Sequence, residues 1–442
     1  MGHIVGGRGI SDKRWDPSVE RATAPRLGRV RPPDRGRASA SVPEFLCDTG
    51  TTAAMYVLGR DSGPDGGVEN PCADKKIDAD RPPTVRFGSF LARDGSAGAA
   101  VGVDADGPHA GVVFGKRGTG KSYTLGVLAE GLGATPGVAP VVIDPMGVFD
   151  GLRAAGGRVI EPRVRPAAIP PEAWPDLLGL DPASGPGSLV WRVVADALDA
   201  TDAVASGSDS ERSDEPPSIA GLRDRVDAAD APTADRRAAA NHLRLAASWG
   251  VFDADAPPVS RLVSDGVPTV LDLAGIPDAA AAAVVRAVAR GLYDARIDGE
   301  IDRLPWLLVD EAHAFFDGVA DPALRTLLTR GRAPGVSLVC ATQRPGALPS
   351  VAVSQSDLLV SHRLTAERDL DRLAEAEATY LPGDLASRLP SETGEALVVD
   401  DATETAHTVR VRERHTPHGG GSPRASETEA ATGAAAKSEG PR

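Results

Sequence analysis

The chain contains 442 residues with a formal net charge of −14, and 41% of its residues are hydrophobic. No apolar run approaches the ~18 residues that a membrane-spanning helix needs, and no signal-peptide core is present. The composition therefore excludes the membrane and secreted classes and predicts a cytoplasmic protein. The three cysteines, Cys47, Cys72 and Cys340, are too few for a disulfide framework and lack the spacing of a zinc site.

The basic residues are almost all arginine, because only six of the 48 are lysine. An acidic, lysine-poor composition is typical of proteins from extreme halophiles, since a high negative charge keeps a protein soluble when salt screens it. We therefore expect a halophilic source. The acidic total does not exclude a nucleic-acid partner, because a local basic channel can coexist with an acidic exterior.

Residues 1–54 carry nine basic and six acidic residues, lack hydrophobic periodicity and are rich in Arg, Gly and Pro. Three interpretations stay open: a disordered tail, a basic arm that contacts DNA, or a mis-annotated start with translation beginning at Met55. Residues 55–105 are predicted to form a small β-rich segment, because 84–104 contains short strands separated by Gly turns.

Residues 106–413 alternate between apolar strands and helices. A strand at 110–114 leads through a Gly-rich loop into a helix from about Lys121. A helical insertion is expected around 165–260, with a polar low-complexity stretch at 203–218 and helical periodicity over 219–250. Further strands are predicted at 139–144, 157–162, 268–274, 305–311, 336–343, 357–364 and, last in the sheet, 395–401, with an Ala-rich helix at 277–297 and disorder over 414–442.

This alternation predicts an α/β fold, with a mainly parallel sheet flanked by helices on both faces. Ligands bind such sheets at the carboxyl ends of the strands. The residues that directly follow each strand are therefore the candidates for chemistry.

The first of these places carries GKRGTGKS, residues 115–122, which fits the phosphate-binding pattern G-x-x-x-x-G-K-[ST] between a strand and a helix. Glycines let successive N–H groups point inward as an anion nest, and the helix directs its positive end at the phosphates. Lys121 would bridge the β- and γ-phosphates of ATP, and Ser122 would bind Mg²⁺. The predicted nucleotide contacts are Gly115, Lys116, Arg117, Gly118, Thr119, Gly120, Lys121, Ser122 and Tyr123.

The second place is WLLVDEAH, residues 306–313, where a buried strand ends in two carboxylates. Asp310 would hold the Mg²⁺ shell, and Glu311 would orient or deprotonate the attacking water. His313 is either a nucleotide contact or a polar residue at a helix start. Asp144, in the turn after the strand at 139–144, is either a polar partner near Mg²⁺ or a cap of its own turn.

The third place is VSLVCATQRP, residues 336–345, whose strand delivers Gln343 to the same edge of the sheet. A neutral amide there can sense the γ-phosphate or position water. Just upstream, Arg330 and Arg332 are either solvated loop residues or, for Arg332 above all, an arginine finger that reaches into the next subunit.

Together with SHRLTAERDLDRL, residues 361–373, these motifs resemble the HerA/FtsK superfamily of DNA-translocating ATPases, in particular its archaeal HerA-like branch, over roughly 84–414. The resemblance implies a RecA-like ATPase core and a hexameric ring of identical subunits that moves duplex DNA. It also implies a NurA-like nuclease partner and ATP hydrolysis at subunit interfaces. Arg332 matches the family's loop arginine, Arg363 is a second interface candidate, and His109 fits a polar residue that precedes the first core strand.

The sequence departs from that family in two places. Val148 stands where relatives carry a Glu after the Asp-Pro turn, and the N-terminal β-barrel is abbreviated to about 56–105. Three functions follow as hypotheses. The first is an ATP-driven DNA translocase that contacts the DNA backbone without reading sequence. The second is an ATP-dependent switch with slow turnover and no motor activity. The third is a motor for protein or conjugative DNA transfer.

Overall fold

The strands that carry the predicted motifs lie side by side in one sheet. The computed structural model describes residues 55–60, 82–92, 94–205, 216–263, 265–365, 369 and 388–421. Twelve described strands join in the order β1-β3-β2-β12-β11-β10-β4-β9-β8-β5-β7-β6. They are β1 Met55–Leu58, β2 Thr84–Leu91, β3 Ala97–Asp104, β4 Ala110–Phe114, β5 Val138–Asp144, β6 Arg158–Ile160, β7 Thr269–Asp272, β8 Leu304–Val309, β9 Ser337–Thr342, β10 Leu358–Ser361, β11 Glu395–Asp400 and β12 Thr405–Val411.

The seven strands from β10 to β6 are all parallel, which brings their carboxyl ends to one edge. Strands β11, β12, β2 and β3 continue the sheet with antiparallel pairs, and β1 pairs parallel with β3. The α/β class with a mainly parallel sheet is confirmed. The predicted N-terminal β segment belongs to this same sheet.

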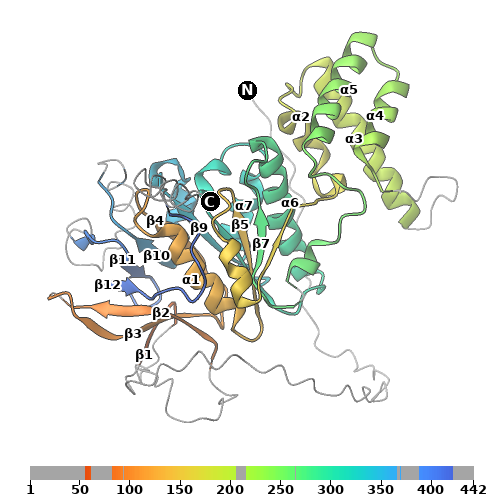
Figure 1. The fold of residues 1–442 in the computed structure, drawn as a ribbon. Coiled ribbons are helices and arrows are strands. Elements are labelled where there is room, and N and C mark those ends of the chain that lie inside the picture. The colour runs from red at the N-terminus through yellow and green to blue at the C-terminus, as the bar shows by residue number, and fades with distance from the viewer. Residues whose placement is uncertain are drawn as a thin grey trace, which may run out of the picture. The chain divides into compact units, whose positions relative to one another are not determined.

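Helices cover both faces of the parallel strands, as Figure 1 shows. Alternate residues of a strand point to opposite faces, so Val113 packs with α1 while Val112 and Phe114 pack with the helices of the other face. Burial on both faces explains why these strands are continuous apolar runs. The helices are α1 Lys121–Gly133, α2 Trp174–Leu177, α3 Gly185–Ala205, α4 Ile219–Ala228, α5 Thr233–Ser248, α6 Asp278–Ile297, α7 Asp321–Arg330 and α8 Ser350–Ser354.

The predicted helical insertion is the bundle α2–α5 (Figure 1). Its chain leaves and returns side by side, because Val164 accepts a backbone bond from Asp253 and donates one to Val251. Trp174 is fully buried and stacks on Phe252 at 5.3 Å between ring centroids. The hydroxyl of Ser218 accepts from the Gly221 N–H and caps α4. Most of the predicted low-complexity stretch, residues 206–215, lies outside the described residues.

Two predictions at the carboxyl end of the core were wrong. The strand predicted as the last, β11, is followed by a further strand, β12, which pairs antiparallel with it through the turn at 401–404. The start of the predicted disordered tail is packed: Thr416 is buried, and its N–H and hydroxyl both bond Glu130 on α1. Glu130 and Thr416 lie 286 positions apart in the sequence, so no local pattern predicts their contact.

Within the described part of the chain, no helix is both long and apolar enough to cross a bilayer.

Candidate functional site

The loop between β4 and α1 has the shape that its sequence predicts. Gly118 and Gly120 adopt positive φ angles of 78° and 122°, which L side chains rarely adopt. A Cβ at Gly115 would lie 2.5 Å from Thr119 Oγ1 and 2.8 Å from the Cβ of His362. The loop therefore requires glycine for close approach as well as for backbone freedom.

Lys121 opens α1 and is almost fully buried, with 5% of its surface exposed. Its Nζ donates to the Lys116 carbonyl at 3.2 Å, within the loop. Burial lowers the pKa of this ammonium, while the charges of Glu311 and Asp310 oppose the shift. A buried cation next to a glycine loop forms an anion-binding site, and water does not screen the charge of that cation.

Ser122 and Asp310 meet directly. The Ser122 hydroxyl donates to Asp310 Oδ2 at 2.7 Å, across 188 positions of sequence. Asp310 is 1% exposed, and burial raises its pKa although the bonds from Ser122 and the Glu311 N–H oppose that shift. The structure thus brings together the two residues predicted to hold the metal.

Glu311 has an unusual backbone, with φ 46° and ψ 39° in the left-handed region. For a residue with a long side chain this conformation costs on the order of 1 kcal/mol or more. Among the described residues its Oε2 is buried without a hydrogen-bond partner, and His313 Nδ1 lies 3.4 Å away. Strain together with an unsatisfied carboxylate is expected of a functional residue, since stability alone would favour neither.

His313 joins the ends of two strands, because its Nδ1 lies 3.1 Å from Thr342 Oγ1 on β9. Burial lowers its pKa, helped by the charges of Arg344 and Lys121. Gln343 directly follows β9 and is half-buried at the same edge as Glu311, because β8 and β9 are neighbouring parallel strands. The positions of Gln343 and His313 agree with their predicted edge, and their roles stay predictions.

Asp144 caps its own turn, the second of its two predicted interpretations. Its carboxylate accepts from the N–H groups of Met146 and Phe149, at 3.2 and 2.9 Å. The side chain is buried, and burial raises its pKa, with a further contribution from the charge of Asp310. The shape of this turn comes from Asp144 itself, without the Glu that Val148 replaces.

Sequence reasoning missed His362, which lies beneath the phosphate loop. This fully buried residue accepts from Thr124 at 2.9 Å through Nε2 and donates to the Glu395 carbonyl at 2.8 Å through Nδ1. Burial lowers its pKa to about 4, so the imidazole is neutral. A Cβ at Gly120 would lie 3.2 Å from its ring. The only signal in the sequence is its place directly after an apolar strand.

Two other predicted residues have partners within the chain. The Arg363 carbonyl accepts from the Lys116 N–H at 3.1 Å, and its guanidinium donates to the Ser391 carbonyl at 3.3 Å. Arg363 therefore lies beside the loop of its own chain. The Tyr123 hydroxyl accepts from the Arg414 N–H at 2.7 Å, so the C-terminal segment reaches the start of α1.

Arg332 does not join this cluster. It lies before β9, at the amino edge of the sheet, and its exposed guanidinium donates to Asp357 Oδ2 at 2.9 Å. Asp357 also bonds His109 Nδ1 at 2.9 Å, and Asp104 lies 3.5 Å from His109 Nε2. Because the phosphate loop is at the opposite edge, Arg332 cannot act on the site of its own chain.

The buried His109 predicts a pH dependence of stability. Asp104 and Asp357 outweigh the effect of burial and raise the pKa of His109 to about 9, with Arg332 and Arg60 as the nearby cations. A pKa raised above the unfolded value means that the stabilisation is fully present below pH 6.5 and is lost as the pH rises through 9. Urea unfolding from pH 6 to pH 10 should show the wild type losing on the order of 3 kcal/mol more than His109→Asn. Parallel curves for the two proteins would contradict the assignment.

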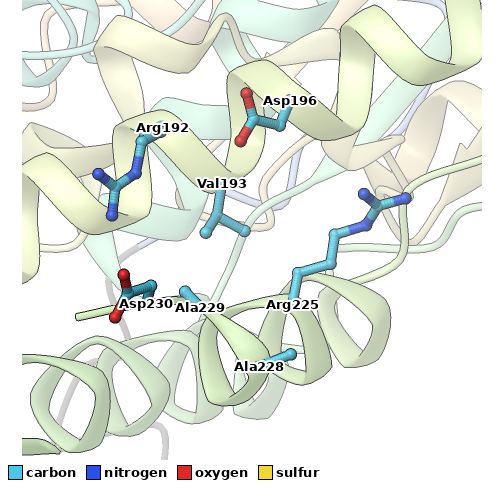
Figure 2. A pocket seen from close by; sticks show the side chains of 7 residues that line it. All are labelled: Arg192, Val193, Asp196, Arg225, Ala228, Ala229 and Asp230. Atoms are coloured by element: carbon cyan, nitrogen blue, oxygen red, sulfur yellow. The ribbon is translucent and has the colours of Figure 1, made fainter.

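One hollow in the helical insertion does not belong to the site. Figure 2 shows it between α3 and the end of α4, lined by Arg192, Asp196, Arg225 and Asp230 around Val193. Two exposed cations and two exposed anions give it no preference for a phosphate or any other anion. It shares no residue with the phosphate loop.

The parallel sheet, the glycine loop with Lys121 and Ser122, and the acid pair at the next strands together define a P-loop NTPase. Residues 85–292 match the family model of the helicase HerA central domain. Over these residues, just under half of the chain, it is similar to P-loop ATPases of the HerA/FtsK type. This confirms the superfamily predicted from the motifs, while the archaeal halophile branch stays a prediction.

Solved structures agree on a RecA-like fold. VirB4 of Thermoanaerobacter pseudethanolicus matches with a TM-score of 0.58 and 17% identity, over 74% of this chain and 96% of that one. The plasmid coupling protein TrwB in complex with ADP and Mg²⁺ matches with a TM-score of 0.50 and 17% identity, over 76% and 97%. A comparison with curated proteins found no match. At these identities the two structures support the fold alone.

Proposed function

We propose that this chain is an ATP-hydrolysing motor that translocates DNA, built as a ring of identical subunits. The observation that carries the proposal is the contact between Ser122 and Asp310, with the strained Glu311 next to it. This arrangement suits hydrolysis, and the match of residues 85–292 to the helicase HerA central domain supports its use on DNA. Hexameric assembly, backbone contacts to duplex DNA and a NurA-like nuclease partner are parts of the same proposal.

The residues present fit ATP and Mg²⁺. The loop has no room for a Cβ at Gly115, as expected where a backbone must approach phosphate closely. Ser122 and Asp310 offer the oxygen ligands that Mg²⁺ prefers. Bound there, Mg²⁺ would neutralise negative charge on the β- and γ-phosphate oxygens. TrwB has been solved with ADP and Mg²⁺, which agrees with this choice.

Hydrolysis then follows from the positions of three side chains. Lys121 holds the phosphates with a buried charge that loses no strength to solvent. Glu311, whose Oε2 has no hydrogen-bond partner among the described residues, accepts a proton from the water that attacks the γ-phosphorus in line. Gln343, at the same edge, orients that water or senses the γ-phosphate.

Arg332 would complete the site of a neighbouring copy. Its exposed guanidinium forms an ion pair with the buried Asp357, which fixes the position of the side chain at the amino edge of the sheet. An arginine supplied in trans stabilises the charge of the transition state. Such an arrangement would couple hydrolysis to contact between subunits.

The proposed motor is tested by ATPase rate with and without duplex DNA over a range of salt concentrations. We expect stimulation by DNA of any sequence, falling as salt rises, because phosphate contacts depend on counterion release. Slow turnover without any response to DNA would favour the ATP-dependent switch instead.

Assembly is tested by mixing two inactive variants, Glu311→Gln and Arg332→Ala. If Arg332 acts in trans, mixed oligomers contain some interfaces with an intact Glu311 and an intact Arg332, and activity returns. The matched control is Arg330→Ala, an exposed arginine two positions away, which should keep its activity alone. Failure of the mixture to regain activity, although mixed oligomers form, would rule out the trans role.

A further inference from the structure

The C-terminal segment 414–421 is fixed to the helix that carries the phosphate loop. Glu130, buried in the last turn of α1, accepts bonds from Arg412 Nη1 at 2.9 Å, from the Thr416 N–H at 3.0 Å and from the His415 N–H at 3.2 Å. The Arg414 side chain, 1% exposed, adds a contact at 3.4 Å. Burial opposes the ionisation of Glu130, but the bonds from Thr416 and Arg412 hold its pKa below its usual value. The segment is therefore anchored by a charged, satisfied network.

From this anchor the segment crosses the start of α1 beside Tyr123. The Arg414 guanidinium lies 5.9 Å from the centroid of the Tyr123 ring, and the His418 ring meets it edge-on at 5.4 Å. His418 Nδ1 lies 3.2 Å from Arg414 Nη1 and so accepts from it. Two aromatic side chains from opposite ends of the core thus stand together, and His418 keeps an exposed face.

The segment continues to the loop that follows β5. The Gly419 N–H donates to the Val148 carbonyl at 3.3 Å, and a Cβ at Gly151 would lie 1.9 Å from the Pro417 carbonyl oxygen. Beyond the exposed His418, the segment presents only the small, exposed residues Gly419 to Gly421. The result is a wall beside the phosphate loop, with aromatic rings at one end and bare backbone at the other.

A nucleotide bound to the phosphate loop would direct its base toward this wall. Ser122 and the acid pair mark the γ-phosphate end, because Ser122 bonds Asp310. Tyr123 is the next residue and points about 100° away around the helix. A nucleoside triphosphate is an extended molecule, so its base leaves the loop away from Asp310. Tyr123 and His418 line the surface on that side.

We propose that Tyr123, His418 and the backbone of 417–421 form the base-binding wall of the nucleotide site, taking the purine ring of a nucleoside triphosphate by stacking. This inference rests on the proposed function, because it assumes that the loop binds a nucleotide. Aromatic stacking suits any base and gains most from the larger purine ring. The phosphate loop would contact only the phosphates. The wall would therefore supply the affinity for the nucleoside.

The experiment compares the binding of ATP with that of inorganic tripolyphosphate by calorimetry, using the full chain. His418→Ala is expected to weaken ATP binding about tenfold and to leave tripolyphosphate binding unchanged. His418→Phe keeps an aromatic ring and should bind ATP within about threefold of the wild type. The matched control is His415→Ala, whose exposed side chain lies three positions away in the same segment.

Two results would overturn the wall. One is an equal loss of ATP and tripolyphosphate affinity in His418→Ala, which would mean that the segment shapes the phosphate loop instead. The other is an affinity of His418→Ala for ATP and for tripolyphosphate that equals the affinity of the wild type. A wild type that binds neither ligand would refute the proposed function as well, so the two failures are distinguishable.

Discussion

Lys121→Ala is expected to weaken ATP binding about 100-fold or more. The ammonium is buried between the glycine loop and two carboxylates, and losing one partner of a buried charge pair costs about 3 kcal/mol or more. The variant should fold normally, since removing a buried cation also removes the free-energy cost of its desolvation. Calorimetry of ATP binding measures the effect.

Thermal unfolding of the same Lys121→Ala preparation is the control. An unchanged midpoint combined with lost binding assigns the effect to the contact with phosphate. Lys121→Arg separates charge from shape, because a guanidinium keeps the charge but is a planar fork in a loop shaped for a point charge. ATP affinity of Lys121→Ala within threefold of the wild type would show that the loop does not hold phosphate in the predicted way.

Glu311→Gln is expected to retain ATP binding and to lose hydrolysis about 100-fold or more. Glutamine keeps the size of the side chain but cannot accept a proton from water, and general base catalysis contributes about 100-fold to 10,000-fold. The backbone conformation should persist, because it is imposed by the end of β8 and not by the charge. Single-turnover hydrolysis with saturating ATP separates the chemical step from binding.

A matched control exists in the same chain. Glu404 is the other described non-glycine residue with a positive φ, 53°, and it is exposed in the turn between β11 and β12. Glu404→Gln makes the same chemical change at a similarly strained backbone, away from the phosphate loop, and should hydrolyse ATP at the wild-type rate. Normal turnover in Glu311→Gln would transfer the role of the base to another group at that edge, with His313 as the nearest candidate.

The sequence alone determined the central parts of the site. The phosphate loop and the strand ending in Asp310 and Glu311 are local patterns, because each needs only a strand and the few residues that follow it. Since carboxyl ends of parallel strands meet at one edge, their meeting could be predicted without coordinates. Ser122 and Asp310 lie 188 positions apart and are joined by a hydrogen bond of 2.7 Å.

The tertiary structure decided what depends on contacts between distant segments. His362 became part of the site because β10 runs next to β4, and a buried neutral histidine leaves no local signature. The fold also brings Asp357, and through it His109, beside Arg332 at the opposite edge of the sheet.

The C-terminal segment shows the same limit most clearly. The tail 414–442 is rich in Gly, Ser, Thr and Ala, and this composition predicts disorder, because composition measures only how much apolar surface a segment can bury by itself. The buried Glu130 on α1 supplies the missing free energy through charged hydrogen bonds to Arg412 and Thr416. Local sequence patterns determined which residues form the predicted phosphate-binding site. Long-range packing decided which other residues surround that site.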